Sequence, residues 1–416
     1  MLEKYDIAIV GGGAAGLAAG IFAGEAARAA GTSRHIIILD GAKSIGAKIL
    51  VSGGGRCNVT HDEIRTDDYF RSRNIVRNIL AAFDEQATVR WMESLGVPLK
   101  REETGKLFPV SNSARTVLAA LLTRAAALGV EVRTESRVTQ IHHGDEFSVV
   151  HEKGELQARR VILCTGGRSL PRTGSDGGGW GIARRLGHSV TETSAALVPL
   201  VLDEKFFHAG VSGLSHEAEL STFVGGKRVD RRTGSLLWTH FGISGPVAMD
   251  ASRFWVMAHG KNLPVELRCS FLPGESFEQV EKAMVTLTAQ RPKLSVANGI
   301  AQRLPERLRL ALISWAGIDP SQPMGQLSRD SRRKLVHALT ALPLPVLRDR
   351  GWNYAEVTAG GVPLEEIDYR TMASRKVPGL FLAGEILDCD GRIGGFNFQW
   401  AWATGYLAGP AAAGAE

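Results

Sequence analysis

The first forty residues alternate between apolar runs and a segment of small residues. Residues 5–10 (YDIAIV) are continuously apolar after Asp6, which predicts a buried parallel strand. Residues 14–30 are rich in alanine and contain no proline, which predicts a helix. Residues 35–39 (HIIIL) predict a second buried strand, and Asp40 follows it directly. The pattern is typical of a strand–helix–strand unit.

The same kind of pattern continues to about residue 194 and returns near residue 356. We expect helices over 74–95 and 113–128, and strands over 130–132, 138–141, 147–150 and 160–165.

Between these parts the hydrophobic pattern changes. Residues 196–272 contain alternating, strand-like stretches, and residues 275–340 follow the helical period. The sequence therefore predicts an α/β fold in which a discontinuous Rossmann-like nucleotide-binding domain carries an inserted substrate-side domain. We expect the nucleotide-binding domain over 1–194 and 346–416, and the insert over 195–345, β-rich over 195–273 and mainly helical over 274–345.

A glycine-rich turn joins the first strand to the first helix. Gly11, Gly13 and Gly16 form the pattern G-x-G-x-x-G. The first glycine permits a tight turn, the second lets the backbone approach a pyrophosphate, and the third allows the helix to pack closely on the strand. The helix then begins at Ala14 and Ala15, whose N–H groups and partial positive charge suit a phosphate.

Asp40 is the acidic residue expected at the end of the second strand. It is placed to accept hydrogen bonds from the adenosine ribose, and an acid there disfavours a 2′-phosphate and hence NADP. Asp40 follows Gly11 by 29 residues, against the roughly 20 expected for the motif. We attribute the difference to a longer helix and loop.

A second cofactor-binding stretch lies near the C-terminus and favours FAD over NAD. Residues 379–405 predict a strand, an acidic loop, a glycine-rich turn and a helix. The helix N-terminus after residues 394–397 would stabilise negative charge on a reduced flavin ring. Asp388, in the acidic loop, would lie near the ribityl chain.

Several longer motifs resemble the BaiN/YhiN-type family of FAD-dependent flavoproteins, within the two-dinucleotide-binding-domain superfamily. They are VGGGAAGLAAG, GAKILVSGGGRCNVTH, CTGGRSLPRTGSDGGGWGIARRLGH, THFGISGP, EVTAGGV and GLFLAGEILDCDGRIGGFNFQWAWATGY, which together reach from residue 10 to residue 406. The resemblance implies non-covalently bound FAD and the fold described above. It also implies that the cofactor is contacted by Lys48, Ser52, Gly53, Gly54, Arg56, Cys57, Asn58, Val138, Thr165, Gly166, Gly167, Gly384, Glu385, Asp388, Gly395, Phe396 and Asn397.

Two side chains are the main candidates for catalysis. Cys57 is either a thiolate activated by the neighbouring Arg56 or a small side chain that packs beside the flavin. Position 62 is aspartate, which excludes a redox pair of cysteines five residues apart in this loop. His240, in a glycine-proline loop of the insert, is either a general acid or a structural residue, and His61 is a weaker candidate of the same kind.

Composition narrows the remaining choices. The chain has 416 residues, four well-separated cysteines and a formal net charge of +6. It lacks a signal-peptide pattern and an apolar run long enough to cross a membrane, and the cysteines fit a reducing compartment, so we expect a cytoplasmic protein. The scattered basic residues argue against a nucleic-acid partner. No spacing typical of a metal site occurs.

The combined expectation is an FAD-dependent oxidoreductase. We favour NAD(P)H-linked reduction of an electron-poor small organic substrate, with hydride transfer through flavin N5. The sequence contains no second strand–GxGxxG–helix unit, so NAD(P)H would bind transiently. Two alternatives remain, namely an oxidase of a small amine or hydroxy compound and a flavoprotein that acts on RNA.

Overall fold

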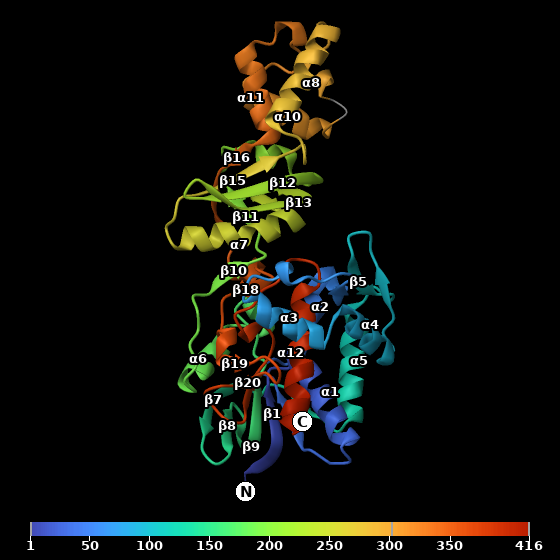
Figure 1. The fold of residues 1–416 in the computed structure, drawn as a ribbon, viewed down its shortest axis with the longest axis vertical. Helices are drawn as coiled ribbons and strands as arrows, with labels where there is room; N and C mark the ends of the chain where they lie inside the picture. The colour runs from blue at the N-terminus through green and yellow to red at the C-terminus, as the bar shows by residue number, and fades with distance from the viewer. Residues whose placement is uncertain (1, 301–302, 415–416) are drawn as a thin grey trace. The chain divides into compact units, whose positions relative to one another are not determined.

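The computed structural model describes residues 2–300 and 303–414 and divides the chain into two compact units. Unit 1 contains the chain up to Thr193 and from Glu356 onward, and unit 2 contains Ser194–Ala355. Each unit has its own hydrophobic core. The ribbon in Figure 1 is coloured along the chain, so unit 1 contains both its blue and its red ends.

Unit 1 is built on a mixed sheet whose central strands are parallel, with β1 near its centre. The apolar residues of β1 lie between those of its two parallel neighbours, with Ile9 beside both Ile38 and Ile162. All three side chains are fully buried, as expected for a parallel sheet covered on both faces. The spatial order is β19 (Ile367–Asp368), β20 (Ala373–Ser374), β21 (Leu380–Leu382), β9 (Gly154–Leu163), β1 (Glu3–Val10), β2 (Ile36–Leu39) and β6 (Glu131–Arg133).

Two further strands extend β9 on its β21 side. β8 (Phe147–His151) pairs antiparallel with the first half of β9, and β7 (Val138–His143) pairs antiparallel with β8. A separate sheet of three short strands has the order β3 (Thr60–His61), β5 (Lys106–Pro109) and β4 (Leu99–Arg101).

Helix α1 (Ala14–Ala29) packs along α12 (Phe396–Ala413), as Figure 1 shows. Glycines permit the close approach, because a Cβ on Gly409 would lie 2.4 Å from the backbone oxygen of Ala19. The other helices of unit 1 are α2 (Ala47–Gly55), α3 (Arg73–Ala82), α4 (Glu85–Ser94), α5 (Ala114–Ala127) and α6 (Gly178–Arg185).

The single helix predicted over 74–95 is two helices in the structure. The break falls at Phe83 and Asp84, and the Asp84 carboxylate accepts a hydrogen bond of 2.7 Å from the N–H of Ala87. An aspartate that caps a helix N-terminus in this way starts a new helix. Hydrophobic periodicity alone continued across this position.

Unit 2 contains a seven-stranded antiparallel sheet followed by helices. The spatial order is β16 (Leu342–Leu344), β15 (Val265–Ser270), β12 (Ser215–Val224), β13 (Lys227–Thr239), β14 (Gly242–Ser244), β11 (Leu200–Leu202) and β17 (Val346–Asp349). Helix α7 (Pro246–Gly260) packs on β12 and β13. The remaining helices are α8 (Phe277–Gln290), α9 (Val296–Gly299), α10 (Glu306–Trp315) and α11 (Arg329–Thr340).

The chain passes from unit 2 back to unit 1 after Ala355, which is later than the boundary predicted between residues 345 and 346. Residues 346–349 form β17, which pairs antiparallel with β11 inside unit 2. These strands are far apart in sequence, so their pairing is set by the tertiary fold and leaves no local signal.

Candidate functional site

The glycine turn after β1 has a separate geometric reason for each glycine. Gly11 has φ +105°, and a Cβ there would lie 2.4 Å from the backbone oxygen of Cys164. A Cβ on Gly16 would lie 1.9 Å from the backbone oxygen of Gly11. A Cβ on Gly13 would meet no protein atom within 4 Å. The protein itself requires Gly11 and Gly16, whereas Gly13 borders open space that a pyrophosphate can fill.

Helix α1 begins at this open space. Its N-cap is Gly13, which supplies no side-chain hydrogen bond, and the first turn contains no acidic residue. The N–H groups of Ala14 and Ala15 therefore have no side-chain cap, and the helix dipole adds partial positive charge at the same place. This arrangement suits a diphosphate.

Asp40 lies beside the turn, at the carboxyl end of β2. One carboxylate oxygen accepts a 2.7 Å hydrogen bond from the N–H of Gly12, and the other accepts one of 2.8 Å from Ala42. Each oxygen keeps a further lone pair, so the carboxylate can brace the turn and still accept a ribose hydroxyl. The backbone oxygen of Asp40 accepts from the N–H of Ser136, which brings the segment before Val138 next to Asp40.

Two predicted cofactor residues carry buried polar atoms without a hydrogen-bond partner among the described residues. They are Oγ1 of Thr165 and Oδ1 of Asn58. Buried polar atoms are normally hydrogen-bonded, so unpaired ones at a ligand site indicate a partner from the ligand. With the open space at Gly13, they show that the residues present fit FAD. Gly166, next to Thr165, has φ +72° and turns the chain away from β9.

The C-terminal end of α2 is irregular. Ser52 breaks the helix with extended backbone, and Gly53 and Gly54 follow in left-handed conformation. A Cβ on Gly54 would again meet nothing within 4 Å, so this backbone is open to a ligand. The glycine run of the SGGGRCN motif thus makes a second open turn in unit 1.

Cys57 does not have the environment of a reactive thiolate. Its side chain is fully buried, and burial raises the pKa of the thiol to about 12 although a hydrogen bond with Ser52 opposes the shift. The guanidinium of Arg56 instead pairs with Glu102 at 2.6 Å and stacks on Phe108. The structure therefore contradicts the thiolate interpretation and favours a packing role for Cys57.

A polar network joins Lys48 to Glu385. The Lys48 ammonium forms an ion pair with the Glu385 carboxylate and donates a 2.6 Å hydrogen bond to Ser169 Oγ. Ser169 Oγ also donates to Glu385 at 2.8 Å, and the N–H of Thr358 donates to the same carboxylate at 2.9 Å. A Cβ on Gly167 would lie 2.8 Å from Glu385 Oε1, so the CTGG turn packs on this network.

Sequence reasoning missed Ser169 and Thr358. Both lie in motifs that were recognised, CTGGRS and EVTAGGV, but no spacing rule singles out their hydroxyls. Ser169 follows β9 and Glu385 follows β21, and these two strands are neighbours in the sheet, whereas Thr358 lies in β18 (Val357–Ala359).

At the C-terminal motif, Gly395 has φ +99°, and a Cβ there would lie 2.6 Å from the backbone of Thr60. The ring of Phe396 stacks on His61, with 5.0 Å between centroids. The Asn397 amide bonds Gly391 through both its oxygen and its nitrogen. This side chain shapes the loop, which leaves the predicted cofactor contact of Asn397 to its backbone.

The two candidate histidines occupy different units. His61 lies in β3, and its ring nitrogens are 3.0 Å from the backbone oxygens of Glu63 and Thr104. His240 lies in unit 2, in the turn between β13 and β14, where its ring contacts Phe241 edge-on. Its predicted catalytic role stays a prediction.

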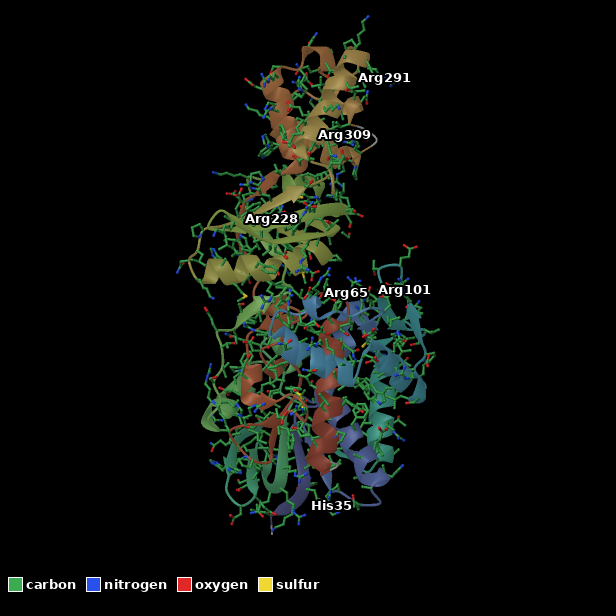
Figure 2. The ribbon with its side chains drawn as sticks, in the orientation of Figure 1. His35, Arg65, Arg101, Arg228, Arg291 and Arg309 are labelled. Carbon is green, nitrogen blue, oxygen red and sulfur yellow. The ribbon has the colours of Figure 1, made fainter. Side chains whose placement is uncertain are left out.

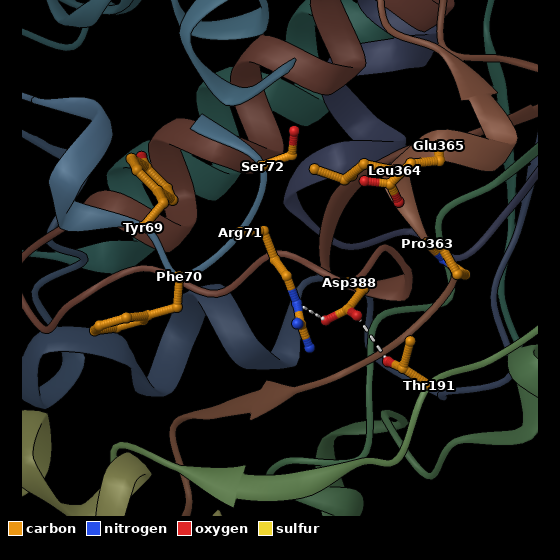
Figure 3. A pocket seen from close by; sticks show the side chains of 9 residues that line it. All are labelled: Tyr69, Phe70, Arg71, Ser72, Thr191, Pro363, Leu364, Glu365 and Asp388. Atoms are coloured by element: carbon orange, nitrogen blue, oxygen red, sulfur yellow. Dashed lines mark hydrogen bonds and ion pairs between the residues drawn. The ribbon is translucent and has the colours of Figure 1, made fainter. Parts of the chain in front are cut away.

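Asp388 faces a pocket of unit 1 that sequence reasoning did not find. The carboxylate is 3% exposed, pairs with Arg71 Nε at 2.6 Å and accepts a 2.7 Å hydrogen bond from Thr191 Oγ1. Figure 3 shows these three side chains converging at one end of the pocket, whose volume is about 550 Å³. Gly384 and Glu385, from the same motif, do not line it.

Over residues 2–300 and 303–414, no group of three or more His, Cys, Asp or Glu side chains is placed to hold a metal ion. No helix in the part of the chain that the structure describes is long and apolar enough to cross a membrane.

Residues 5–411 match the family described as HI0933-like protein Rossmann domain. The chain is 34% identical over 98% of both chains to a 3-dehydro-bile acid delta(4,6)-reductase of Clostridium scindens. It is 31% identical over 97% of both chains to a ribosomal RNA dihydrouridine synthase of Escherichia coli. Among solved structures, a quinol-fumarate reductase with menaquinol molecules is similar with a TM-score of 0.51 and 17% identity, covering 100% of this chain and 71% of that one. Together these matches confirm the predicted Rossmann-type fold, FAD as the cofactor and an oxidoreductase activity.

Proposed function

Because the chain belongs to the HI0933-like family of FAD-dependent oxidoreductases, we propose that it reduces a carbon–carbon double bond conjugated to a carbonyl, with NAD(P)H as electron donor. The turn at Gly13 and the oxygens of Thr165 and Asn58 would hold FAD, which would supply hydride transfer from NAD(P)H to the electron-poor carbon, while the neighbouring carbon would take its proton from solvent. The protein supplies the orientation and the electrostatic environment for this chemistry.

The names of the two relatives support this reaction class. One name describes reduction of a delta(4,6) double-bond system beside a 3-oxo group, and the other describes formation of dihydrouridine. Uridine is converted to dihydrouridine by addition of two hydrogens across a double bond conjugated to a ring carbonyl. Both names therefore describe reduction of an electron-poor double bond, although the two substrates differ greatly in size.

The observation that carries the proposal is the fit of this chain to FAD. Gly13 and Gly54 border open space, Thr165 and Asn58 have unpaired buried oxygens, and α1 begins without a side-chain cap. Helix α12 also begins without one, at Gly395. An uncapped helix N-terminus stabilises negative charge, which is what a reduced flavin ring carries.

Anaerobic stopped-flow absorbance tests the proposal on the FAD-loaded protein. NADH or NADPH should bleach the flavin band, and a conjugated enone should restore it faster than buffer does. Bleaching by a small amine or hydroxy compound alone, with peroxide formed on admission of oxygen, would establish the oxidase alternative instead. The reductase would also be refuted if oxygen restored the flavin band but neither an enone nor a uridine acceptor did.

A second candidate, reduction of uridine in RNA, is favoured by the charge distribution. Unit 2 carries 20 Lys and Arg against 14 Asp and Glu, whereas unit 1 carries 29 of each, so the whole net charge of +6 belongs to unit 2. Figure 2 labels three of the cations, Arg228 on β13, Arg291 after α8 and Arg309 on α10.

Binding of RNA by the holoprotein distinguishes the two substrate classes. If RNA is the substrate, ribosomal RNA should bind with an affinity that falls steeply as salt rises. It should also reoxidise the reduced flavin. Absence of RNA binding at about 100 mM salt would exclude this candidate and leave the small-molecule reductase.

A further inference from the structure

The pocket beside Asp388 has walls from three segments of unit 1. Two are the segments 69–72 and 363–365, and the third wall is formed by two residues from separate parts of the chain, Thr191 and Asp388. Its volume of about 550 Å³ lies within the range of small-molecule sites. None of the glycines of the two open turns lines this pocket, so the pocket and the turn expected to hold the pyrophosphate have different lining residues.

Arg71 is held in this pocket by one nitrogen. Its Nε donates to the buried carboxylate of Asp388, whose second oxygen is occupied by Thr191. Its two terminal nitrogens have no hydrogen-bond or ion-pair partner among the described residues, and the side chain is 34% exposed. A buried carboxylate therefore fixes the direction of the guanidinium and leaves its outer donors to the pocket.

An arginine on an ordinary surface is not held in this way. Arg73, two residues along the chain, is 76% exposed and pairs with the similarly exposed Asp67. Exposed pairs of this kind contribute little and fix little, because both side chains remain solvated and mobile. Arg71 is therefore a preorganised hydrogen-bond donor, whereas Arg73 is a solvated surface charge.

The geometry of the donors indicates the chemistry of the ligand. The two terminal nitrogens of a guanidinium form a planar fork that matches two oxygens of one carboxylate or phosphate. Ser72 adds a hydroxyl that makes no cap hydrogen bond to α3. Glu365 also lines the pocket, but it is exposed, so water screens its charge.

We propose that this pocket binds an oxyanion, a carboxylate or a phosphate, through the terminal nitrogens of Arg71. Asp388 and Thr191 act as positioning residues that hold the guanidinium. The site does not depend on the reaction proposed above.

Calorimetry on the FAD-loaded full chain tests the proposal, with inorganic phosphate and benzoate as separate probes. We expect one of them to bind at a single site with a Kd of about 1 mM. Arg71→Gln should weaken binding about tenfold or more, because it removes a charge-assisted bidentate contact of roughly 1.5–3 kcal/mol. The matched control Arg73→Gln should bind like the unchanged protein. The probe that binds tells a phosphate site from a carboxylate site.

Three results would overturn the proposal. The first is that neither probe binds, and the second is that Arg71→Gln binds the probe as well as Arg73→Gln does. The third is that Arg71→Gln loses its flavin absorbance, which would assign the guanidinium to FAD. If Arg71→Gln does not fold, Asp388→Asn replaces it. That variant keeps the cation and loosens its direction, so unaltered anion affinity in it would contradict the positioning role.

Discussion

Replacing single glycines in the first turn by alanine separates the demands of the fold from the demands of the cofactor. Gly16→Ala places a Cβ 1.9 Å from the backbone oxygen of Gly11, and neither backbone can move without disturbing β1 or α1. We expect a loss of at least about 3 kcal/mol in the free energy of unfolding, as for severe overpacking.

Gly13→Ala should leave the fold almost unchanged. Gly13 has φ −79° and ψ −166°, which any residue adopts, and a Cβ there meets nothing within 4 Å. The gain from a less flexible unfolded chain is about 0.4–1 kcal/mol, and it is offset by the poorer capping of alanine at a helix N-cap. The apoprotein should therefore unfold within about 1 kcal/mol of the unchanged protein.

The same methyl group would occupy the space expected for the pyrophosphate. Displacing phosphate from one or two charged hydrogen bonds costs about 1.5–3 kcal/mol, so FAD affinity should fall roughly 10- to 150-fold. The assay is titration of apoprotein with FAD, followed by flavin fluorescence, together with thermal unfolding of the apoprotein. Gly260→Ala, at an exposed helix end with open space around it, is the matched control. Unchanged FAD affinity in Gly13→Ala, or unfolding as severe as in Gly16→Ala, would refute the reasoning.

Three further predictions concern individual side chains. Because burial raises its pKa to about 12, Cys57 should resist iodoacetamide in the native protein at pH 8, and rapid labelling seen by mass spectrometry would restore the thiolate interpretation. Although burial opposes the shift, hydrogen bonds from Lys376, Ser189 and His188 hold the pKa of Glu366 at about 2, below its unfolded value of about 4.5. The stabilisation is therefore present above pH 4.5 and is lost as the pH falls toward 2, so Glu366→Gln should lower the melting temperature at pH 7 and lower it progressively less below pH 4.5. Lys48→Met leaves the Glu385 carboxylate without its cation and should lower the free energy of unfolding, measured by chemical denaturation, by roughly 1–3 kcal/mol. If the double variant with Glu385→Gln loses as much as the sum of the two single variants, the pair is not coupled.

Most of the cofactor turn could be predicted because it is local in sequence. The conformations of Gly11 and Gly16 follow from contacts within one strand–turn–helix unit, and Asp40 follows the next strand. The role of Cys57 could not be decided from the sequence, for the opposite reason. Sequence proximity to Arg56 suggested activation, but the fold buries the thiol and turns the guanidinium to Glu102.

The sequence by itself determined the nucleotide-binding fold and the FAD turn, because glycine conformation, strand hydrophobicity and helix starts are properties of neighbouring residues. Only the tertiary structure decided the network of Lys48, Ser169 and Glu385 and the pocket of Arg71 and Asp388. In each case the partners are more than a hundred residues apart along the chain. Their meeting depends on which strands become neighbours in the sheet and on which carboxylates become buried. No local pattern of residues records either fact.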